Sequence, residues 1–291
     1  KNIANAALVF RGYNVANLGR SHELLEHPRY ADIVAEALDE AGTVCADVVG
    51  RPVDLIQRVR NQEETSLETY DEAIALIVAM EIAQLRLLER FFDIDYHRSR
   101  MTFGYSLGEI TALIAGGVFE LKHALRVPVA MAADSAVLAH DCTLAILFSR
   151  GDALPMAQIH RLCLEINQLG DGVVGVSAYL SPNSLLVMAS GVTMGMFKKR
   201  IREEYPRSVY VRPNEYKWPP LHSPLVWAKN IPNRSAVMLH TLPGGFAPPS
   251  PRVLSLVTGT FAYDEYNCRE LLSDWVDHPQ RLWDAVYETL C

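Results

Sequence analysis

The segment Gly104-Tyr105-Ser106-Leu107-Gly108-Glu109 contains the pattern G-x-S-x-G, which is typical of a serine nucleophile. A short apolar run precedes it and a helix-compatible stretch follows it. Between a strand and a helix, this pattern makes a sharp turn that exposes the serine hydroxyl, and the amide of the next residue faces a developing oxyanion. We therefore predict Ser106 as the nucleophile and the Leu107 amide as an oxyanion donor. A simple packing turn is the alternative interpretation.

A serine nucleophile needs a base, and one of the nine histidines lies in an unusual context. His222 lies in Pro219-Pro220-Leu221-His222-Ser223-Pro224, where the prolines restrict the backbone on both sides. An isolated histidine is ordinarily a surface or half-buried polar residue. The proline context makes His222 the candidate base.

The elements that must position these residues alternate between strands and helices. Apolar spacing predicts a long helix over 70–92, and a strand is expected immediately before the serine. Pro128 should kink or break a helix expected over 121–138, because proline lacks an amide hydrogen. The other expected elements of this part are a strand over 7–10, a helix within 21–45 and a helix over 107–116.

The stretch from Cys142 to Asn214 has a β-α-β-β-α-β order, which is the ferredoxin-like arrangement. We therefore predict a ferredoxin-like small domain, residues 141–214, inserted into a larger α/β domain made of residues 1–140 and 215–291. The expected strands are 142–150, 173–178, 185–189 and 208–211, and the expected helices are 154–169 and 193–204.

Composition limits the class of protein. The chain has 291 residues, of which 49% are hydrophobic and 21% charged, as in ordinary globular proteins. No apolar run reaches the roughly 20 residues that span a bilayer, so no membrane association is expected. A net charge of −7 argues against nucleic-acid binding. The five cysteines form no C-x-x-C pair and the first residues do not resemble a signal peptide, which favours a cytoplasmic protein.

Taken together, these motifs resemble the malonyl-CoA:ACP transacylase family, the acyltransferases of fatty-acid and polyketide synthesis. The family elbow G-H-S-x-G-E matches 104–109, and its H-S-P-x segment matches 222–225. The resemblance covers essentially the whole chain and implies an α/β-hydrolase-like large domain with a parallel sheet. Weaker matches are Phe10-Arg11-Gly12-Tyr13-Asn14 to F-P-G-Q-G-S-Q, 254–259 to x-x-N-V-T-G, and 279–283 to the terminal P-V-R-W region.

The resemblance implies a two-step transfer with acyl-CoA or a phosphopantetheine thioester as substrate and an acyl carrier protein as partner. Ser106 would attack the thioester while His222 takes its proton, and a carrier thiol would then take the acyl group. The Leu107 and Tyr13 amides would hold the oxyanion. A backbone carbonyl near Trp275 would orient the imidazole. No metal and no permanently bound cofactor are implied.

Departures from the family pattern concern the acyl pocket. The family arginine that pairs with the malonyl carboxylate falls on Met131, and Arg126 lies about 140° away around a helix. A pocket without this arginine but with Glu72 should reject a carboxylated acyl group and accept a neutral one. A shifted register at Pro128, with another basic residue in the role, is the alternative. The predicted pocket residues are Met131, Glu72, Trp275, Tyr105 and Leu221.

Other functions remain open beside a transferase of neutral acyl groups. An acyl-ACP hydrolase that clears stalled acyl groups in a polyketide pathway would use water in place of the carrier thiol. A general α/β-hydrolase esterase would need an acid and a late histidine, for which His278 is available. A non-catalytic scaffold is disfavoured because Ser106, His222 and Glu109 are all present.

A cluster of basic residues on the second helix of the small domain could receive an acidic carrier protein. Its members are Lys198, Lys199, Arg200 and Arg202. The alternative interpretation is a solvated helix face, as most charge runs are.

Overall fold

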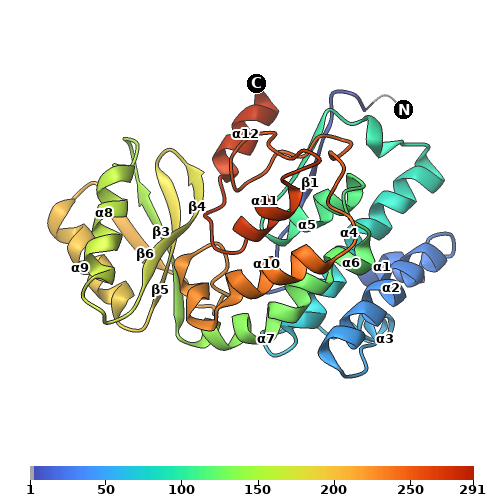
Figure 1. Ribbon diagram of the computed structural model, residues 1–291, viewed down its shortest axis with the longest axis horizontal. Helices are drawn as coiled ribbons and strands as arrows, with labels where there is room; N and C mark the ends of the chain where they lie inside the picture. The colour runs from blue at the N-terminus through green and yellow to red at the C-terminus, as the bar shows by residue number, and fades with distance from the viewer. Residues whose placement is uncertain (1–2) are drawn as a thin grey trace. The chain divides into compact units, whose positions relative to one another are not determined.

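The computed structural model describes residues 3–291, which form two compact units (Figure 1). The first is built from the chain up to Ala133, from Ala236–Ser255 and from Thr260–Leu272. The second is built from Asp134–Ser235, Leu256–Gly259 and Ser273–Cys291. Each unit has its own sheet. The predicted division at residues 141 and 214 stays a prediction.

The first unit contains a parallel sheet of two strands, β1 and β2, that pair from Ala7 opposite Met101 to Phe10 opposite Gly104. Thr102 forms a further parallel bridge with Val253. This confirms the expected parallel sheet, whereas the α/β-hydrolase-like description stays a prediction. The elements of this unit are β1 Ala7–Phe10, α1 Ser21–Glu26, α2 Ala31–Val49, α3 Leu55–Arg60, α4 Tyr70–Phe92, η1 Tyr96–Arg98, β2 Met101–Gly104, α5 Leu107–Ala115 and α6 Leu121–Ala124.

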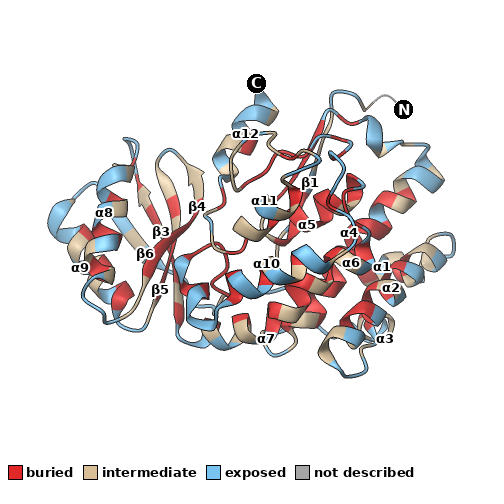
Figure 2. Cartoon of the chain, in the orientation of Figure 1, coloured by how far each residue is buried: buried red, intermediate tan, exposed pale blue. Residues whose placement is uncertain are grey.

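Helices α4 and α5 form the core of the first unit. Helix α5 packs against both strands and against α4, and α4 packs against α2. Figure 2 shows α4 and α5 largely in the colour of buried residues. A helix that is apolar around most of its circumference is stable only in such a buried position. The first turn of α5 is therefore held on a rigid support.

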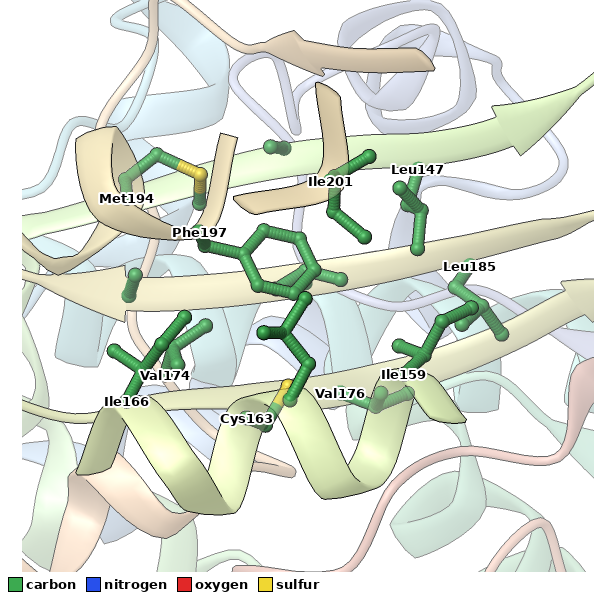
Figure 3. Close-up of a cluster of buried hydrophobic side chains, with 14 of the residues drawn as sticks. Leu147, Ile159, Cys163, Ile166, Val174, Val176, Leu185, Met194, Phe197 and Ile201 are labelled. Atoms are coloured by element: carbon green, nitrogen blue, oxygen red, sulfur yellow. The ribbon is translucent and has the colours of Figure 1, made fainter. Parts of the chain in front are cut away.

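The second unit contains an antiparallel sheet in the order β4-β5-β3-β6. Helices α8 and α9 lie on one face of it, where Phe197, Ile159 and Val176 belong to one apolar cluster (Figure 3). The predicted β-α-β-β-α-β order is confirmed. The elements of this unit are β3 Cys142–Ser149, α8 Met156–Asn167, β4 Val174–Ser181, β5 Ser184–Ser190, α9 Thr193–Glu204, β6 Val209–Pro213, η2 Pro224–Lys229 and α12 Leu282–Leu290.

Three helices contribute residues to both units: α7 Arg126–His140, α10 Ile231–Thr241 and α11 Cys268–Asp274. The break expected at Pro128 occurs earlier, between α6 and α7, at Leu125. The ring of a proline clashes with the carbonyl of the fourth residue before it, here Ala124, which is the last residue of α6. Pro128 itself lies in the first turn of α7, where proline is tolerated.

Among residues 3–291, no helix combines the length and the apolar character that crossing a bilayer requires.

Candidate active site

Ser106 lies in the turn between β2 and α5 with φ 55° and ψ −120°. A positive φ is uncommon for a residue other than glycine and indicates a backbone held by its surroundings. The predicted strand-turn-serine-helix arrangement is therefore present. A serine in this position presents its hydroxyl away from the sheet, as a nucleophile requires.

The two glycines that flank Ser106 are sterically required. A Cβ on Gly104 would lie 1.9 Å from the carbonyl carbon of Gly108, and a Cβ on Gly108 would lie 2.4 Å from the carbonyl oxygen of Phe10. Real Cβ atoms do not approach other atoms so closely. The turn can therefore form only with glycine at both positions.

The loop after β1, residues 11–18, lies directly on this turn. The Tyr105 amide donates to the Phe10 carbonyl at 3.0 Å. A Cβ on Gly12 would lie 3.0 Å from the Cβ of Ser106. Leu107 is the first residue of α5, so its amide is one of the first-turn donors that have no carbonyl partner within the helix. The structure thus brings together the segments that carry the two predicted oxyanion residues, Leu107 and Tyr13.

Two carboxylates that the sequence analysis missed anchor the loop. Glu81 accepts the Arg11 amide at 2.6 Å, and Glu64 accepts the Asn17 amide at 2.9 Å. Tyr13 lies between Arg11 and Asn17 in the sequence, and its ring packs edge-on against Tyr70, with 4.8 Å between ring centroids. Of the two carboxylates, only Glu81 could have been noticed in the sequence, because it is a single carboxyl group within an apolar stretch of α4.

His222 lies in the second unit with φ 62°. Its amide donates to the Val276 carbonyl at 2.8 Å, and its Nδ1 lies 2.7 Å from the Trp275 carbonyl oxygen. A carbonyl oxygen can only accept, so Nδ1 carries the hydrogen and Nε2 is the nitrogen that can take up a proton. The prediction that a carbonyl near Trp275 orients this imidazole is confirmed.

The surroundings keep His222 uncharged. Its side chain is buried, and this burial lowers its pKa to about 4, although the hydrogen bond to Trp275 acts in the opposite direction. The Trp275 ring packs edge-on against the imidazole with 5.1 Å between centroids. At neutral pH the imidazole is therefore in the form that a general base needs.

The predicted pocket residues are found in both units. Met131 and Tyr105 belong to the first unit, and Trp275 and Leu221 to the second. Met131, Trp275 and Leu221 are buried, and burial raises the pKa of Tyr105 to about 12. Arg126, the nearest arginine to Met131 in the sequence, pairs with Asp47 at 2.5 Å.

Glu72 differs from the expectation. Arg51 and Arg58 each form an ion pair with its carboxylate at 2.7 Å, and Arg51 also pairs with Asp71 at 2.7 Å. Two guanidinium groups therefore compensate the charge of Glu72, and the expected rejection of a carboxylated substrate stays a prediction. Neither arginine carries a sequence signal that points to Glu72, since the partners lie in different elements.

The basic cluster on α9 is partly neutralised by neighbouring acids. Arg200 pairs with Glu165 at 3.0 Å and with Glu204 at 3.1 Å, and Lys199 lies 3.9 Å from Glu203. Lys198 and Arg202 form no ion pair within the part of the chain that the structure describes. The predicted docking residues thus fall into a paired and an unpaired set.

The histidine considered for an esterase mechanism, His278, is exposed. Its Nδ1 lies 2.9 Å from the Asp277 carboxylate and 3.0 Å from the Asp274 carbonyl. These are hydrogen-bond contacts of an exposed side chain.

Comparison with known proteins connects this geometry to a fold. The chain has a TM-score of 0.77 and 20% identity with MCAT from Streptococcus pneumoniae, covering 98% of this chain and 85% of that one. A second match is a complex described as a type II PKS acyl-carrier protein with its malonyl-transacylase. Its TM-score is 0.71 and its identity 21%, and the match covers 95% of this chain and 82% of that one. A third match is the acyltransferase domain from module 8 of the salinomycin polyketide synthase. Its TM-score is 0.75 and its identity 19%, and the match covers 100% of this chain and 63% of that one.

Sequence comparison gives a weaker link. The chain is 26% identical over 183 residues to the PKS-NRPS hybrid synthetase acdB of Aspergillus candidus, a match that covers 62% of this chain and 7% of the synthetase. No family model matches the chain. At these identities the solved structures show a shared fold. The predicted resemblance to malonyl-CoA:ACP transacylases is confirmed at that level.

Proposed function

We propose that the chain is an acyltransferase that moves an acyl group from a thioester donor, through an acyl-Ser106 intermediate, to an acyl carrier protein. The observation that carries this proposal is the positive-φ turn at Ser106, with the loop of residues 11–18 packed against it, in a chain with the transacylase fold. Strained, glycine-flanked serines of this kind serve as nucleophiles in acyl transfer.

In the proposed reaction the Ser106 Oγ bonds to the thioester carbonyl carbon while His222 Nε2 takes the hydroxyl proton. The tetrahedral oxyanion is held by the Leu107 and Tyr13 amides. Its collapse breaks the carbon–sulfur bond, and the proton passes from His222 to the departing thiolate. In the second half, the carrier thiol attacks acyl-Ser106 and the same proton transfers run in reverse.

The acyl group is proposed to be neutral, such as acetyl or a longer chain. Support comes from Met131, a buried thioether at the position where the family resemblance implies a guanidinium group. A carboxylate placed there would lose its water without gaining a partner, which costs several kcal/mol. The nearest arginine in the sequence, Arg126, pairs with Asp47 instead.

The partner is proposed to be an acyl carrier protein, since one structural neighbour is a transacylase in complex with its carrier. Lys198, Lys199, Arg200 and Arg202 are the proposed docking surface. Carrier proteins are acidic, so a local basic surface favours their approach despite the net negative charge of the whole chain.

The proposal is tested by weighing the intact protein after incubation with acetyl-CoA, longer acyl-CoA thioesters, malonyl-CoA and the corresponding pantetheine thioesters. We expect an adduct that Ser106→Ala abolishes and that forms about 10²–10⁴-fold more slowly in His222→Ala. Adducts that form as readily on Ser106→Ala would exclude Ser106 as the acyl carrier residue. Loss of the adduct to water at one rate, with or without carrier protein, would identify a hydrolase instead.

A further inference from the structure

Glu81 is a buried carboxyl group in α4 that the proposed reaction does not use. It lies in the middle of the helix, is 9% exposed, and has buried apolar residues such as Val78 and Ile82 near it in the helix sequence. A carboxyl group in such a position is tolerated only when its oxygen atoms are hydrogen-bonded. Both oxygen atoms of Glu81 have a partner.

The two partners of Glu81 come from the two segments that surround the nucleophile. Oε1 accepts the Arg11 amide at 2.6 Å, and Oε2 accepts the Thr111 hydroxyl at 2.6 Å. Arg11 precedes Tyr13 in the loop by two residues, and Thr111 lies in α5, which begins immediately after Ser106. One side chain therefore ties the loop to the helix.

The hydrogen bond from the Arg11 amide to Glu81 is the second of two that hold the Phe10–Arg11 peptide group. The Phe10 carbonyl and the Arg11 amide belong to the same peptide unit, whose oxygen accepts from Tyr105 at 3.0 Å and whose N–H donates to Glu81. A peptide unit is planar and rigid, so fixing both of its polar atoms fixes the direction in which the chain continues. The next residues are Gly12, which packs on Ser106, and Tyr13.

We propose that Glu81 is a positioning residue that orients the Phe10–Arg11 peptide and thereby aims the Tyr13 amide at the oxyanion. This inference rests on the proposed function, because Tyr13 acts as an oxyanion donor only there. Oxyanion donors contribute when they are held in place before charge develops. Glu81 supplies that constraint from a helix rather than from the loop itself.

The position of Glu81 also predicts how the reaction responds to pH. Burial raises its pKa to about 7, while Thr111 and Arg11 lower it. Among the described residues, Arg11 in the loop is the charged group that acts on Glu81. Glu109 in α5 accepts the Tyr263 hydroxyl at 2.7 Å. Ionised Glu81 places a negative charge beside the loop and opposes the oxyanion.

The test compares Glu81→Gln, Glu81→Leu and Thr111→Val. The matched control is Glu40→Gln. Glu40 in α2 accepts from Arg86 of α4 at 2.8 Å, and among the described residues no hydrogen bond or ion pair joins it to the loop. Two quantities are measured: the rate constant for acyl-Ser106 formation between about pH 5 and 9, and hydrogen exchange at the Arg11 amide. A glutamine keeps an acceptor for Arg11 and a donor for Thr111, whereas leucine keeps neither.

We expect Glu81→Leu to slow acylation roughly 10- to 100-fold without raising KM, and to expose the Arg11 amide to exchange. This is less than the 10²–10³-fold cost of losing an oxyanion donor outright. Glu81→Gln should retain most of the rate at low pH and protect the Arg11 amide. It should also lack the fall in rate that we expect of the wild type as pH rises through about 7. Thr111→Val should have a smaller effect in the same direction as leucine.

Two results would overturn the inference: a wild-type acylation rate in folded Glu81→Leu, or an unchanged fall in rate near pH 7 in Glu81→Gln. Failure of the proposed function looks different, because the wild type would then form no acyl-enzyme with any thioester. In that case, hydrogen exchange at the Arg11 amide still tests the positioning role of Glu81. Equal protection in the wild type and Glu81→Leu would overturn the positioning role.

Discussion

Ser106 and His222 share a backbone property although they lie in different units. Both have positive φ, 55° and 62°, and neither is a glycine. Such a conformation costs of order 1–3 kcal/mol and persists only where the surroundings impose it. At Ser106 the packing of Gly104 and Gly108 imposes it, and at His222 the bond from its amide to Val276 does so. Strain of this kind is concentrated at functional sites.

Met131 gives the first prediction at the residue scale. Because no guanidinium group stands at this position, acetyl or a longer neutral acyl thioester should load Ser106 faster than malonyl-CoA does. Met131→Arg should raise malonyl loading about 10- to 150-fold, the equivalent of a charge-assisted pair worth roughly 1.5–3 kcal/mol. The measurement is the rate of each adduct by intact mass.

Met131→Leu is the matched control for a changed side chain without a charge. Glu72 is held by Arg51 and Arg58 and should not capture the new guanidinium group. Adding Glu72→Gln should therefore change little, and a large further gain in the double variant would contradict the paired state of Glu72. Efficient malonyl loading by the wild type would refute the neutral-acyl proposal.

At the residue scale, the sequence indicates local backbone shape, whereas the catalytic roles of Ser106 and His222 stay predictions. The glycines around Ser106 and the prolines around His222 specify a backbone shape within a few residues. The Arg51–Glu72–Arg58 network and the Glu81 bonds to Arg11 and Thr111 join segments far apart in the chain. No pattern in the sequence records such pairings.

At the element scale, the strand-turn-helix unit makes a prediction about stability. Gly104→Ala should destabilise the protein by about 3 kcal/mol or more, because its Cβ would lie 1.9 Å from the Gly108 carbonyl carbon and the backbone must move. Gly195→Ala in α9 is the control, since a Cβ there meets nothing within 4 Å. It should stabilise by roughly 0.5–1 kcal/mol through helix propensity. Urea unfolding measures both; comparable effects of the two substitutions would argue against a sterically closed turn.

Helix α9 gives a second prediction at this scale. Lys198→Glu with Arg202→Glu should slow transfer to a carrier protein several-fold at low salt and leave transfer to a small pantetheine thioester unchanged. Salt should reduce the difference, because exposed charges are screened beyond about 8–10 Å at physiological ionic strength. Arg200→Glu is the comparison, since its guanidinium already pairs with Glu165 and Glu204. Equal losses with both acceptors would exclude docking at α9.

At the scale of the whole molecule, the two units differ in how well their architecture could be predicted. The order of elements in the second unit follows from alternating short strands and amphipathic helices, each readable within its own segment. In the first unit, the break between α6 and α7 falls at Leu125 rather than at Pro128, because proline acts on the carbonyl four residues earlier. The partition of α7, α10 and α11 between units depends on tertiary packing, which local periodicity does not record.

The two units also carry titrating groups with opposite effects on the stability of the molecule. The pKa of His222 falls from 6.5 to about 4 on folding, so its contribution is present above pH 6.5 and is lost as pH falls through 4. The pKa of Glu81 rises from 4.5 to about 7, so its contribution is present below pH 4.5 and is lost as pH rises through 7. Between about pH 4.5 and 6.5, His222 makes the free energy of unfolding rise with pH and Glu81 makes it fall, so the two effects oppose each other.

Substituting either group should therefore leave the pH dependence of the other visible in the free energy of unfolding. This free energy is measured by urea titration at each pH. In Glu81→Gln, stability should rise with pH between about 4 and 6.5, on the order of 3 kcal/mol in total, because only the unfolded chain takes up the His222 proton there. In His222→Gln, stability should fall by a similar amount between about pH 4.5 and 7. Parallel pH profiles in the wild type and both variants would show that neither buried group is linked to folding in this way.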